Sequence, residues 1–500
     1  MFVLADVNPY LEAPKWLSAG DTSWQLTAAT FVGMQSIPGL AILYAGLVKK
    51  KWALNSAVMV FYAFAVVLLT WTLIGYNMSF GHPAKLGPGI LAAFIGVPGP
   101  ALSPMYEIGQ SVVPLAASTM PDLHFSGSAM IYFQFVFAAI TPILIAGSLF
   151  GRMNFKAWML FVPIWSVIVY SIGAFALWGG GWLAQLGAVD YSGGYVIHLA
   201  AGVSGFVAAS VVGPRLLADQ RDFEPNNLIM AFAGAGILWL GWNGFNGGDP
   251  YFANADAGAA VLNTNLATAT ALLVWLVADM LKTGKPNAVS MINGMIAGLV
   301  AITPCAGFVN GYGAIVVGAV TIIPWLTLNY LSGWSVLKKV DDTFSVLHTH
   351  GVAGLIGGLM AGIAADPKML EYVANPAAGK NGSDVFVTGW WYGNPIQFVH
   401  QLEAAAFIIV VNIIGTFVIL KAISLVVPLR ATEDHMEAGD LAIHGIDPMP
   451  GIGGARRATA PASMTKQSAH GKNILWSRYR WSAGTSAGTP PQVPNTRSHK

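Results

Sequence analysis

Two histidines occupy matching places in two apolar stretches of the sequence. Residues 198–205 and 350–357 both follow the pattern H-x-x-A-G-x-x-G, and the two patterns lie 152 residues apart. A neutral imidazole both donates and accepts hydrogen bonds, and it exchanges a proton near neutral pH. His198 and His350 are therefore candidates for guiding a small polar molecule or for relaying a proton.

The composition of the chain indicates that these stretches lie in a membrane. Of the 500 residues, 55% are hydrophobic and only 10% are charged, whereas soluble domains are about one-quarter charged. The 57 Gly and 28 Pro agree with this, because both residues are commoner in membrane helices than in soluble ones. The sequence predicts an all-α polytopic membrane protein and excludes a soluble enzyme, a nucleic-acid-binding protein and a disordered scaffold. One cysteine, Cys305, excludes an internal disulfide.

Membrane-spanning helices are expected wherever the apolar stretches are long enough. A bilayer core about 30 Å thick needs about 20 apolar residues for each helix. Run 89–99 is too short to cross and is expected to form a loop packed against the bundle. Eleven stretches qualify: 24–48, 54–80, 128–151, 157–178, 193–213, 228–246, 257–281, 288–306, 311–331, 344–364 and 401–428.

The basic residues predict how the chain is oriented in the membrane. Alternate loops hold eleven Lys and Arg residues, while the N-terminus and the intervening loops hold four: Lys15, Lys85, Lys368 and Lys380. By the positive-inside rule the N-terminus lies outside and the C-terminus in the cytoplasm, and an odd number of spans likewise places the two termini on opposite sides. Residues 1–23 are then an extracellular segment, and they lack the pattern of a cleavable signal peptide. Residues 446–500 are rich in Pro, Gly, Ser, Thr and Arg and are predicted to be a disordered tail.

The matching histidine patterns indicate an inverted repeat. Each half contains five spans, an odd number, so the two histidine-bearing helices cross the membrane in opposite directions. The halves are residues 24–213 and 228–364, followed by the helix 401–428. Such repeats place the substrate path at their interface, and the glycines of the pattern let two helices approach closely.

Two other roles compete for the histidines. Each ring could be a polar group satisfied by a neighbouring helix, although an ionisable residue within a membrane is by default a functional candidate. Each could also bind a metal, but no cluster of Asp, Glu or Cys lies nearby in sequence, and two ligands are too few. His198 lies near the outer end of its stretch and His350 near the inner end of its own. Their rings meet only if both helices are offset or broken toward the midplane.

Aromatic residues accompany the histidine repeat and complete a resemblance to a known family. Most of the 17 Trp are expected to anchor span ends at the membrane surfaces, but Trp178 precedes three glycines, Asp190 and His198. The chain resembles the ammonium transporter family (Amt/Mep/Rh), closest to the Amt branch, in collinear order from about residue 24 to 445. The resembling blocks are 38–41, 44–47, 133–137, 178–181, 190–194 with His198, 241–246, 303–304 and 350–352.

The resemblance implies a homotrimer with one pore in each subunit, and it assigns roles to individual residues. In the family, an outer site recruits the substrate, an aromatic pair closes the pore below it, and a histidine pair lines the narrow pore. Carried onto this sequence, these roles fall on Phe133 and Trp178 (recruitment), Phe137 and Phe245 (aromatic pair), His198 and His350 (histidine pair), Trp242 and Thr303 (pore lining and support), and Asp190 (support of the site).

The chain departs from the family pattern at Asp249. Many members carry a small hydroxyl residue at this position of the recruitment site, and a carboxylate would attract a cation more strongly. Asp249 also precedes Pro250, and Asp-Pro is a common turn signal. Both roles, substrate binding and turn formation, remain open for Asp249.

The resemblance implies transport of ammonium or methylammonium through the bilayer of the cell membrane, with no cofactor and no enzymatic activity. Ammonium would be recruited at the outer site and deprotonated, and ammonia would pass the histidines while the proton moves separately, which gives net electrogenic uptake. The alternatives are an ammonium sensor with the same fold and a neutral gas channel. An intramembrane enzyme is disfavoured because no nucleophile or carboxylate dyad accompanies the histidines. Residues 429–445 resemble the family's cytoplasmic regulatory segment, which in bacteria meets a PII-type signalling protein.

Overall fold

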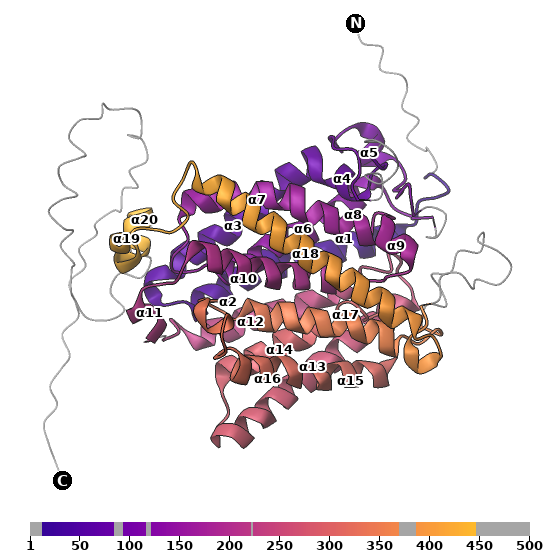
Figure 1. Cartoon of the computed structure of the whole chain (residues 1–500). Helices are drawn as coiled ribbons and strands as arrows, with labels where there is room; N and C mark the ends of the chain where they lie inside the picture. The colour runs from indigo at the N-terminus through magenta and orange to yellow at the C-terminus, as the bar shows by residue number, and fades with distance from the viewer. Residues whose placement is uncertain (1–12, 85–93, 117–121, 222–223, 370–386, 447–500) are drawn as a thin grey trace, which may run out of the picture. The chain divides into compact units, whose positions relative to one another are not determined.

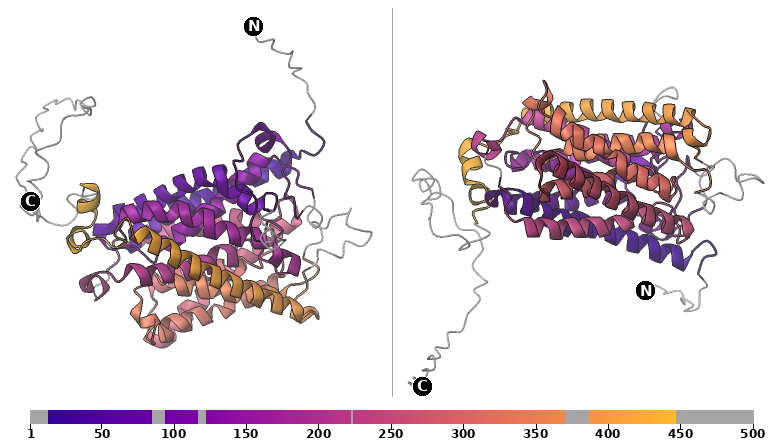
Figure 2. Two further views of the ribbon diagram at one scale, coloured as in Figure 1. Left: turned by 45° about the horizontal axis from the view of Figure 1, so that its top comes forward. Right: turned by 90° about the horizontal axis from the view of Figure 1, so that it is seen from below.

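The computed structural model is a bundle of helices that run side by side between two ends (Figure 1). It describes residues 13–84, 94–116, 122–221, 224–369 and 387–446, and these contain no β-strand beyond isolated bridges. The predicted tail, 446–500, lies outside the described residues except for Ile446. α1 (Ala19–Met34) begins at one end of the bundle, and α19 (Glu433–Ala438) and α20 (Asp440–His444) lie at the other (Figures 1 and 2).

The first half of the chain contains five helical segments that are long and apolar enough to cross a membrane. Short π-helical turns interrupt three of them and begin the fifth, whereas α6 has none. The segments are Ala19–Leu47 (α1; η1, Gln35–Gly39; α2, Leu40–Leu47), Lys50–Phe80 (η2, Lys50–Trp52; α3, Ala53–Thr70; η3, Trp71–Gly75; α4, Tyr76–Phe80), α6 (Gly127–Ala146), Phe155–Leu186 (α7, Phe155–Trp165; η5, Ser166–Tyr170; α8, Ser171–Leu177; α9, Trp182–Leu186) and Gly194–Val212 (η6, Gly194–Leu199; α10, Ala200–Val212).

The second half contributes five more such segments and one shorter apolar helix among the described residues. The five are α12 (Leu228–Gly247), α13 (Ala255–Thr283), Gly311–Leu331 (α15, Gly311–Val320; α16, Ile322–Leu326; η7, Thr327–Leu331), Leu347–Ala364 (η9, Leu347–Val352; α17, Ala353–Ala364) and α18 (Ile396–Ser424). Short helices outside the spans are α5 (Pro104–Ile108), α11 (Leu217–Arg221), η8 (Leu337–Lys339) and η10 (Trp390–Tyr392).

The all-helical, multi-span prediction is confirmed, and most predicted span boundaries agree with the helices to within a few residues. The eighth predicted span, 288–306, corresponds to α14 (Ala288–Ile302), which has 15 residues. This is shorter than the roughly 20 residues that a full crossing needs, so ten described segments meet the length for spanning. Of the predicted loop 89–99, the described part is non-helical, and Phe94 packs on Trp182 and Phe407 with ring centroids 6.0 and 5.8 Å apart.

Asparagines mark where several of the helices begin. A helix leaves its first backbone N–H groups without partners, and an Asn side chain that precedes it accepts a hydrogen bond from one of them. Replacing such a cap with alanine costs about 1 kcal/mol. Side-chain caps of this kind are made by Asn154 for α7, Asn227 for α12, Asn254 for α13, Asn287 for α14 and Asn310 for α15.

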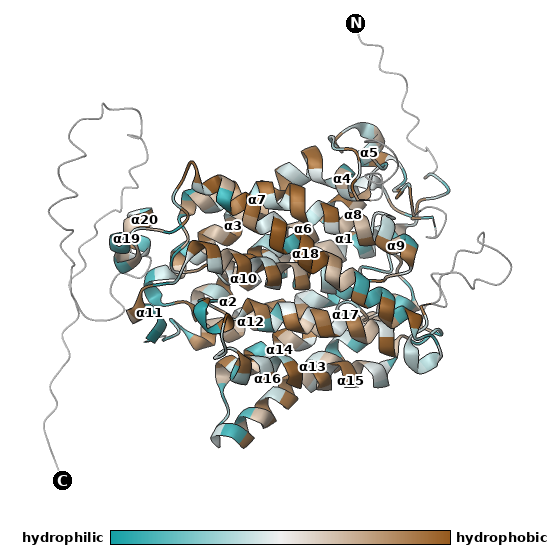
Figure 3. Cartoon of the chain, viewed as in Figure 1, coloured by the Kyte–Doolittle hydropathy of each residue, from teal (hydrophilic) through white to brown (hydrophobic). Residues whose placement is uncertain are grey.

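The outer faces of the helices are apolar, as lipid contact requires. On α18 the exposed side chains include Val410, Ile414, Phe417 and Val418, and hydrophilic residues gather at α11, α19 and α20 (Figure 3). Several buried polar side chains, in contrast, pair with one another: Thr416 accepts a hydrogen bond from the Trp165 indole (3.0 Å) and donates to Ser204 (2.8 Å). Unpaired polar groups are costly in an apolar interior, which explains this pattern.

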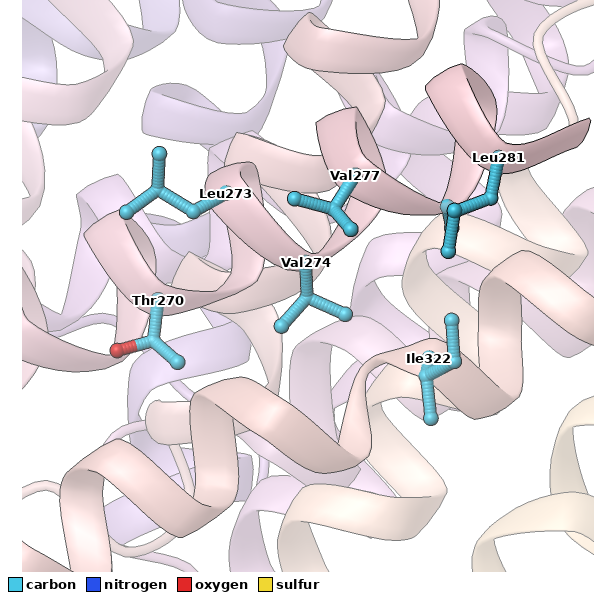
Figure 4. A pocket seen from close by; sticks show the side chains of 7 residues that line it. Thr270, Leu273, Val274, Val277, Leu281 and Ile322 are labelled. Carbon is cyan, nitrogen blue, oxygen red and sulfur yellow. The ribbon is translucent and has the colours of Figure 1, made fainter. Parts of the chain in front are cut away.

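One apolar groove lies on the surface between α13 and α16. Its volume is about 420 Å³, and Figure 4 shows that α13 lines most of its length while Ile322 of α16 closes the far side. The groove is lined by Thr270, Leu273, Val274, Val277, Ala278, Leu281 and Ile322. Such a surface suits lipid or another helix rather than water.

A buried arginine ties together the segments at the end of the bundle where α19 and α20 lie. The Arg152 guanidinium is fully buried and donates to the carbonyl oxygens of Ser148 (2.6 Å), Gly213 (2.6 Å) and Asp341, and to the Thr343 hydroxyl (2.7 Å). Burial lowers the pKa of Arg152 to about 10, so the group stays charged at neutral pH. Arg152 thereby connects α6 and α10 to the segment that leads into η9.

The C-terminal helices pack on the beginning of α3. The Asp440 carboxylate accepts hydrogen bonds from the backbone N–H groups of Leu54 and Asn55, each 2.8 Å, and the Lys51 ammonium donates to Met436 O (2.8 Å). The predicted segment 429–445 therefore caps the bundle. Its predicted regulatory role stays a prediction.

Candidate functional site

Asp190 organises the start of the helix that carries His198. Its carboxylate oxygens accept hydrogen bonds from the backbone N–H groups of Gly193 (3.1 Å), Tyr195 (2.9 Å) and Val196 (2.9 Å). Gly193 has φ +108°, a conformation that favours glycine. Burial raises the pKa of Asp190 to about 6, and the backbone donors oppose that rise. Asp190 thus caps η6 and fixes the path of the backbone toward His198.

The second half of the chain repeats this cap at Asp342, which the sequence reasoning missed. The Asp342 carboxylate accepts a hydrogen bond from Leu347 N (2.9 Å), and Ser345 has φ +57°. Asp342 and Ser345 lie 152 residues beyond Asp190 and Gly193, the same offset that relates the two histidines. The signal was present in the sequence, because each histidine follows an aspartate by eight positions.

The two histidine-bearing helices cross through glycines, and the contacts are reciprocal. A Cβ at Gly202 would collide with the backbone of Gly351 and approach Val346 O, while a Cβ at Gly354 would collide with Gly194 O and Leu199 N. Gly354, Val346 and Gly351 lie 152 residues beyond Gly202, Gly194 and Leu199. The two glycines therefore contact equivalent positions of the opposite repeat. The described structure therefore has a local pseudo-two-fold axis at the histidines, as the inverted repeat predicts.

The histidine rings meet at this crossing. The two Nδ1 atoms of His198 and His350 are 3.2 Å apart, and the ring centroids are 5.4 Å apart with an interplanar angle of 22°. Both side chains are buried. The rings touch because η6 and η9 begin only a few residues before the histidines and the glycine contacts bring these first turns together. One Nδ1 carries the hydrogen and the other accepts it.

His198 also has a ring nitrogen that no described residue pairs with. Its Nε2 is buried and lacks a hydrogen-bond partner within the described ranges. One face of the ring stacks on Trp242 (centroids 5.2 Å, 17°), and the Trp242 indole donates to the Thr303 hydroxyl at 2.8 Å. The predicted residues Trp242 and Thr303 therefore position the His198 ring and leave Nε2 available to a small molecule.

A line of aromatic rings leads to the histidines from the end of the bundle where α1 begins. Phe137 and Phe245 lie 4.4 Å apart between centroids, and Phe245 lies 5.9 Å from His198. Phe133 lies 4.8 Å from Phe137, and Trp178 meets Phe137 edge-on at 6.3 Å. The predicted recruitment pair and aromatic pair are thus adjacent, and together they reach His198.

Hydrogen bonds join this aromatic line to Asp190. The Trp178 indole donates to Asp190 O at 2.7 Å, and the Ser192 hydroxyl donates to Phe245 O at 2.9 Å. The backbone around Asp190 therefore holds both Trp178, a predicted recruitment residue, and Phe245 of the predicted aromatic pair.

Asp249 forms a turn and also directs its carboxylate inward. The Tyr251 N–H donates to Gly248 O (3.0 Å), so Asp249 and Pro250 are the central residues of the turn. Asp249 Oδ2 is buried without a hydrogen-bond partner among the described residues. Burial raises the pKa of Asp249 well above its ordinary value, and the charge of Asp190 adds to the rise. The turn places an unpaired acceptor beside the aromatic site.

All ten predicted site residues therefore belong to one connected cluster. The structure adds three aromatic residues beyond the histidines that the sequence reasoning missed: Phe344 stacks on Tyr44 (5.6 Å, 21°), and Phe150 contacts both, at 5.7 and 4.9 Å. Tyr44 begins the resembling block 44–47 but was assigned no role, and no shared motif marked Phe150 or Phe344, because the three rings come together only in the fold. Within the described ranges, no group of three or more His, Cys, Asp or Glu side chains could hold a metal ion.

Comparison with known proteins agrees with this geometry. The model of the Ammonium Transporter Family matches residues 23–447. The chain is 50% identical to "Ammonium transporter 2" of Arabidopsis thaliana over 438 residues, which cover 87% of this chain and 89% of that protein. Among solved structures it resembles Saccharomyces cerevisiae Mep2, at a TM-score of 0.71 and 30% identity, over 84% of this chain and 89% of that one.

A protein described as a "Sensor Amt Protein" is also similar, at a TM-score of 0.67 and 25% identity, over 85% of this chain and 98% of that one. The family match begins within α1 and ends just after α20, and it includes all ten predicted site residues. The chain is a multi-pass membrane protein that belongs to the ammonium transporter family.

Proposed function

We propose that this chain transports ammonium across the cell membrane, recruiting the cation at the aromatic site and passing ammonia along the histidine pair. One observation carries the proposal. The aromatic line from Phe133 to Phe245 ends at His198, whose buried Nε2 is unpaired among the described residues. Such a nitrogen, if it lacks the hydrogen, accepts from ammonia, and otherwise it donates to it.

The energetics favour separation of ammonia from its proton. Moving an intact small cation into an apolar interior costs an idealised 20 kcal/mol or so. Contact with aromatic faces such as Phe133 and Trp178 contributes about 0.5–2 kcal/mol each, which holds the cation at the entrance but does not carry it inward. Ammonium can shed its charge by losing a proton, whereas K⁺ and Na⁺ cannot. Separate movement of the proton would make uptake electrogenic.

The direct test is the current that purified protein produces in liposomes. We expect ammonium addition to produce a current that saturates with concentration, and equal concentrations of K⁺ or Na⁺ to produce none. Ammonia uptake without current would instead support the neutral gas channel. Binding without either would support a sensor, which the likeness to the sensor protein keeps as the second candidate.

Asp249 is proposed to bind the cation at the recruitment site. Its unpaired, buried Oδ2 supports this role, and so does the added attraction that a carboxylate offers over a hydroxyl. Asp249→Ser should raise the half-saturating ammonium concentration about tenfold, the loss of one charged hydrogen bond, with the maximal current retained. An unchanged half-saturating concentration would mean that Asp249 serves only the turn.

Trimer assembly and cytoplasmic regulation are proposed on family grounds with support from two surfaces. The apolar groove between α13 and α16 suits a helix of a neighbouring subunit (Figure 4). The docking of α20 on the start of α3, through Asp440, supports a regulatory segment that a PII-type protein could engage. Mass measurement of the detergent-solubilised protein tests the trimer.

A further inference from the structure

Tyr251 follows the turn that carries Asp249, and its backbone has a conformation unusual for an aromatic residue. Its φ is +64°, and Tyr251, Ser335 and Ser345 are the non-glycine residues with positive φ in the described parts of the chain. A bulky residue avoids this left-handed region, and where it occupies it the surrounding structure imposes the strain, often at a functional site. Glycine would adopt the same turn without strain. The side chain at position 251 therefore has a role that the turn alone does not explain.

Two side chains of α1 fasten the backbone on either side of Tyr251. Asp21 Oδ1 accepts a hydrogen bond from Ala253 N (2.8 Å), and the Trp24 indole donates to Gly247 O (2.8 Å). The segment between them cannot relax without breaking one of these bonds. The Tyr251 ring is consequently held in a fixed position.

The ring of Tyr251 adjoins the recruitment residues. It meets Phe133 edge-on, with centroids 6.1 Å apart and an interplanar angle of 79°. Its hydroxyl accepts a hydrogen bond from Gln134 Nε2 (2.9 Å), and the Gln134 side chain is only 1% exposed. Gln134 directly follows Phe133 on α6, so one turn of helix supplies both an aromatic wall and the group that fixes the phenol.

Two residues associated with this ring carry oxygen acceptors without donors: Gln134, its hydrogen-bond partner, and Asp249, two residues before it in the chain. Gln134 Oε1 and Asp249 Oδ2 are both buried and have no hydrogen-bond partner among the described residues. The Tyr251 oxygen has a second lone pair beyond the one that Gln134 uses. A ligand with several N–H donors and no acceptor is the natural complement to such a set, because a buried acceptor left without a donor is costly.

We propose that Tyr251, fixed by Gln134, is a specificity-determining residue that selects ammonium over alkylated ammonium ions. The inference rests on the proposed recruitment of ammonium beside Phe133. Ammonium presents four N–H donors, whereas methylammonium presents three and a methyl group. A site built to pair each donor rejects the analogue that lacks one, because a site oxygen is then left unpaired.

Tyr251→Phe tests the proposal, because it keeps the ring and removes only the oxygen. We expect the half-saturating ammonium concentration to rise about fivefold, as for the loss of one hydrogen bond. The value for methylammonium should change by less than about twofold, since methylammonium already leaves one acceptor unpaired. Both values are measured in proteoliposomes as current and, on the same purified protein, as binding by calorimetry. Gln134→Leu should also raise the ammonium value relative to the methylammonium value. Combining Gln134→Leu with Tyr251→Phe should raise this ratio little beyond Tyr251→Phe alone. Tyr312→Phe, which alters an exposed phenol on α15, is the matched control.

Each outcome is decisive. A ratio of the half-saturating ammonium concentration to the half-saturating methylammonium concentration that rises in Tyr251→Phe but not in Tyr312→Phe supports the proposal, whether it is seen in currents or in binding alone. If Tyr251→Phe has normal ammonium currents and the same ratio of half-saturating concentrations as the unmodified protein, this inference is overturned and the proposed function stays intact. If the wild-type protein neither binds ammonium nor conducts it, both are overturned.

Discussion

Replacing His350 with alanine should reduce ammonium-dependent current at least about tenfold, which corresponds to about 1.4 kcal/mol. The variant loses the ring whose Nδ1 lies 3.2 Å from that of His198. His198 Nδ1 is then buried without a partner, which costs about 1–3 kcal/mol, and water can enter the vacated space. The measurement is the initial current in proteoliposomes at saturating ammonium, together with the current in K⁺.

His348→Ala is the matched control for that experiment. His348 lies two residues earlier on the same π-helical turn, but its Nδ1 pairs with the Thr327 hydroxyl at 3.0 Å instead of with His198. We expect His348→Ala to retain most of the ammonium current. Normal current and normal exclusion of K⁺ in His350→Ala would contradict the proposed role of the histidine pair.

Asp190→Ala should destabilise the protein more than any other single change considered for the site. Three backbone N–H groups, of Gly193, Tyr195 and Val196, lose their acceptor. Each buried donor left unpaired costs about 1–3 kcal/mol, so the sum is several kcal/mol. We expect the melting temperature of the purified protein to fall by about 3–9 °C, and transport to be lost because the His198 turn no longer has a fixed start.

The related cap in the second half supplies the comparison. Asp342→Ala removes one backbone hydrogen bond, from Leu347, and should lower the melting temperature by less than half as much. Asp190→Asn, which keeps one carbonyl oxygen, should fall between the two. If Asp190→Ala proved as stable as Asp342→Ala, the capping role derived for Asp190 would be wrong.

The sequence predicted the spans well because membrane helices have a strong and local signal. Each predicted stretch needed only to be long and apolar, while caps such as Asn227 and Asn254, which the prediction did not use, mark the helix starts in the structure. The match between His198 and His350 predicted the inverted repeat, because an offset shared by two motifs does not depend on knowing the fold. The ten site residues came from motifs in collinear order, and the structure places them in one cluster.

The features that escaped prediction depend on contacts between distant segments. The phenol of Tyr251 gains significance only from Gln134, which precedes it by 117 residues, and no local pattern reports this pairing. Arg152 resembled any loop arginine until its buried hydrogen bonds to Gly213 and Thr343 appeared. Asp342 was the exception, because the spacing that reveals it is visible in the sequence: an aspartate stands eight positions before each histidine.

The pseudo-two-fold axis between the histidines has a consequence for directionality. The Nδ1 atoms of His198 and His350 meet there, and the repeat places them in equivalent positions. The single hydrogen between them makes the contact asymmetric, because only one of the two atoms carries it. The two tautomers of the pair differ in which half of the molecule holds that hydrogen. In the proposed transport, the contact between the two Nδ1 atoms therefore gives no preference for inward or outward flow. Any rectification must arise from neighbours that the repeat does not duplicate, such as Trp242, which stacks on His198.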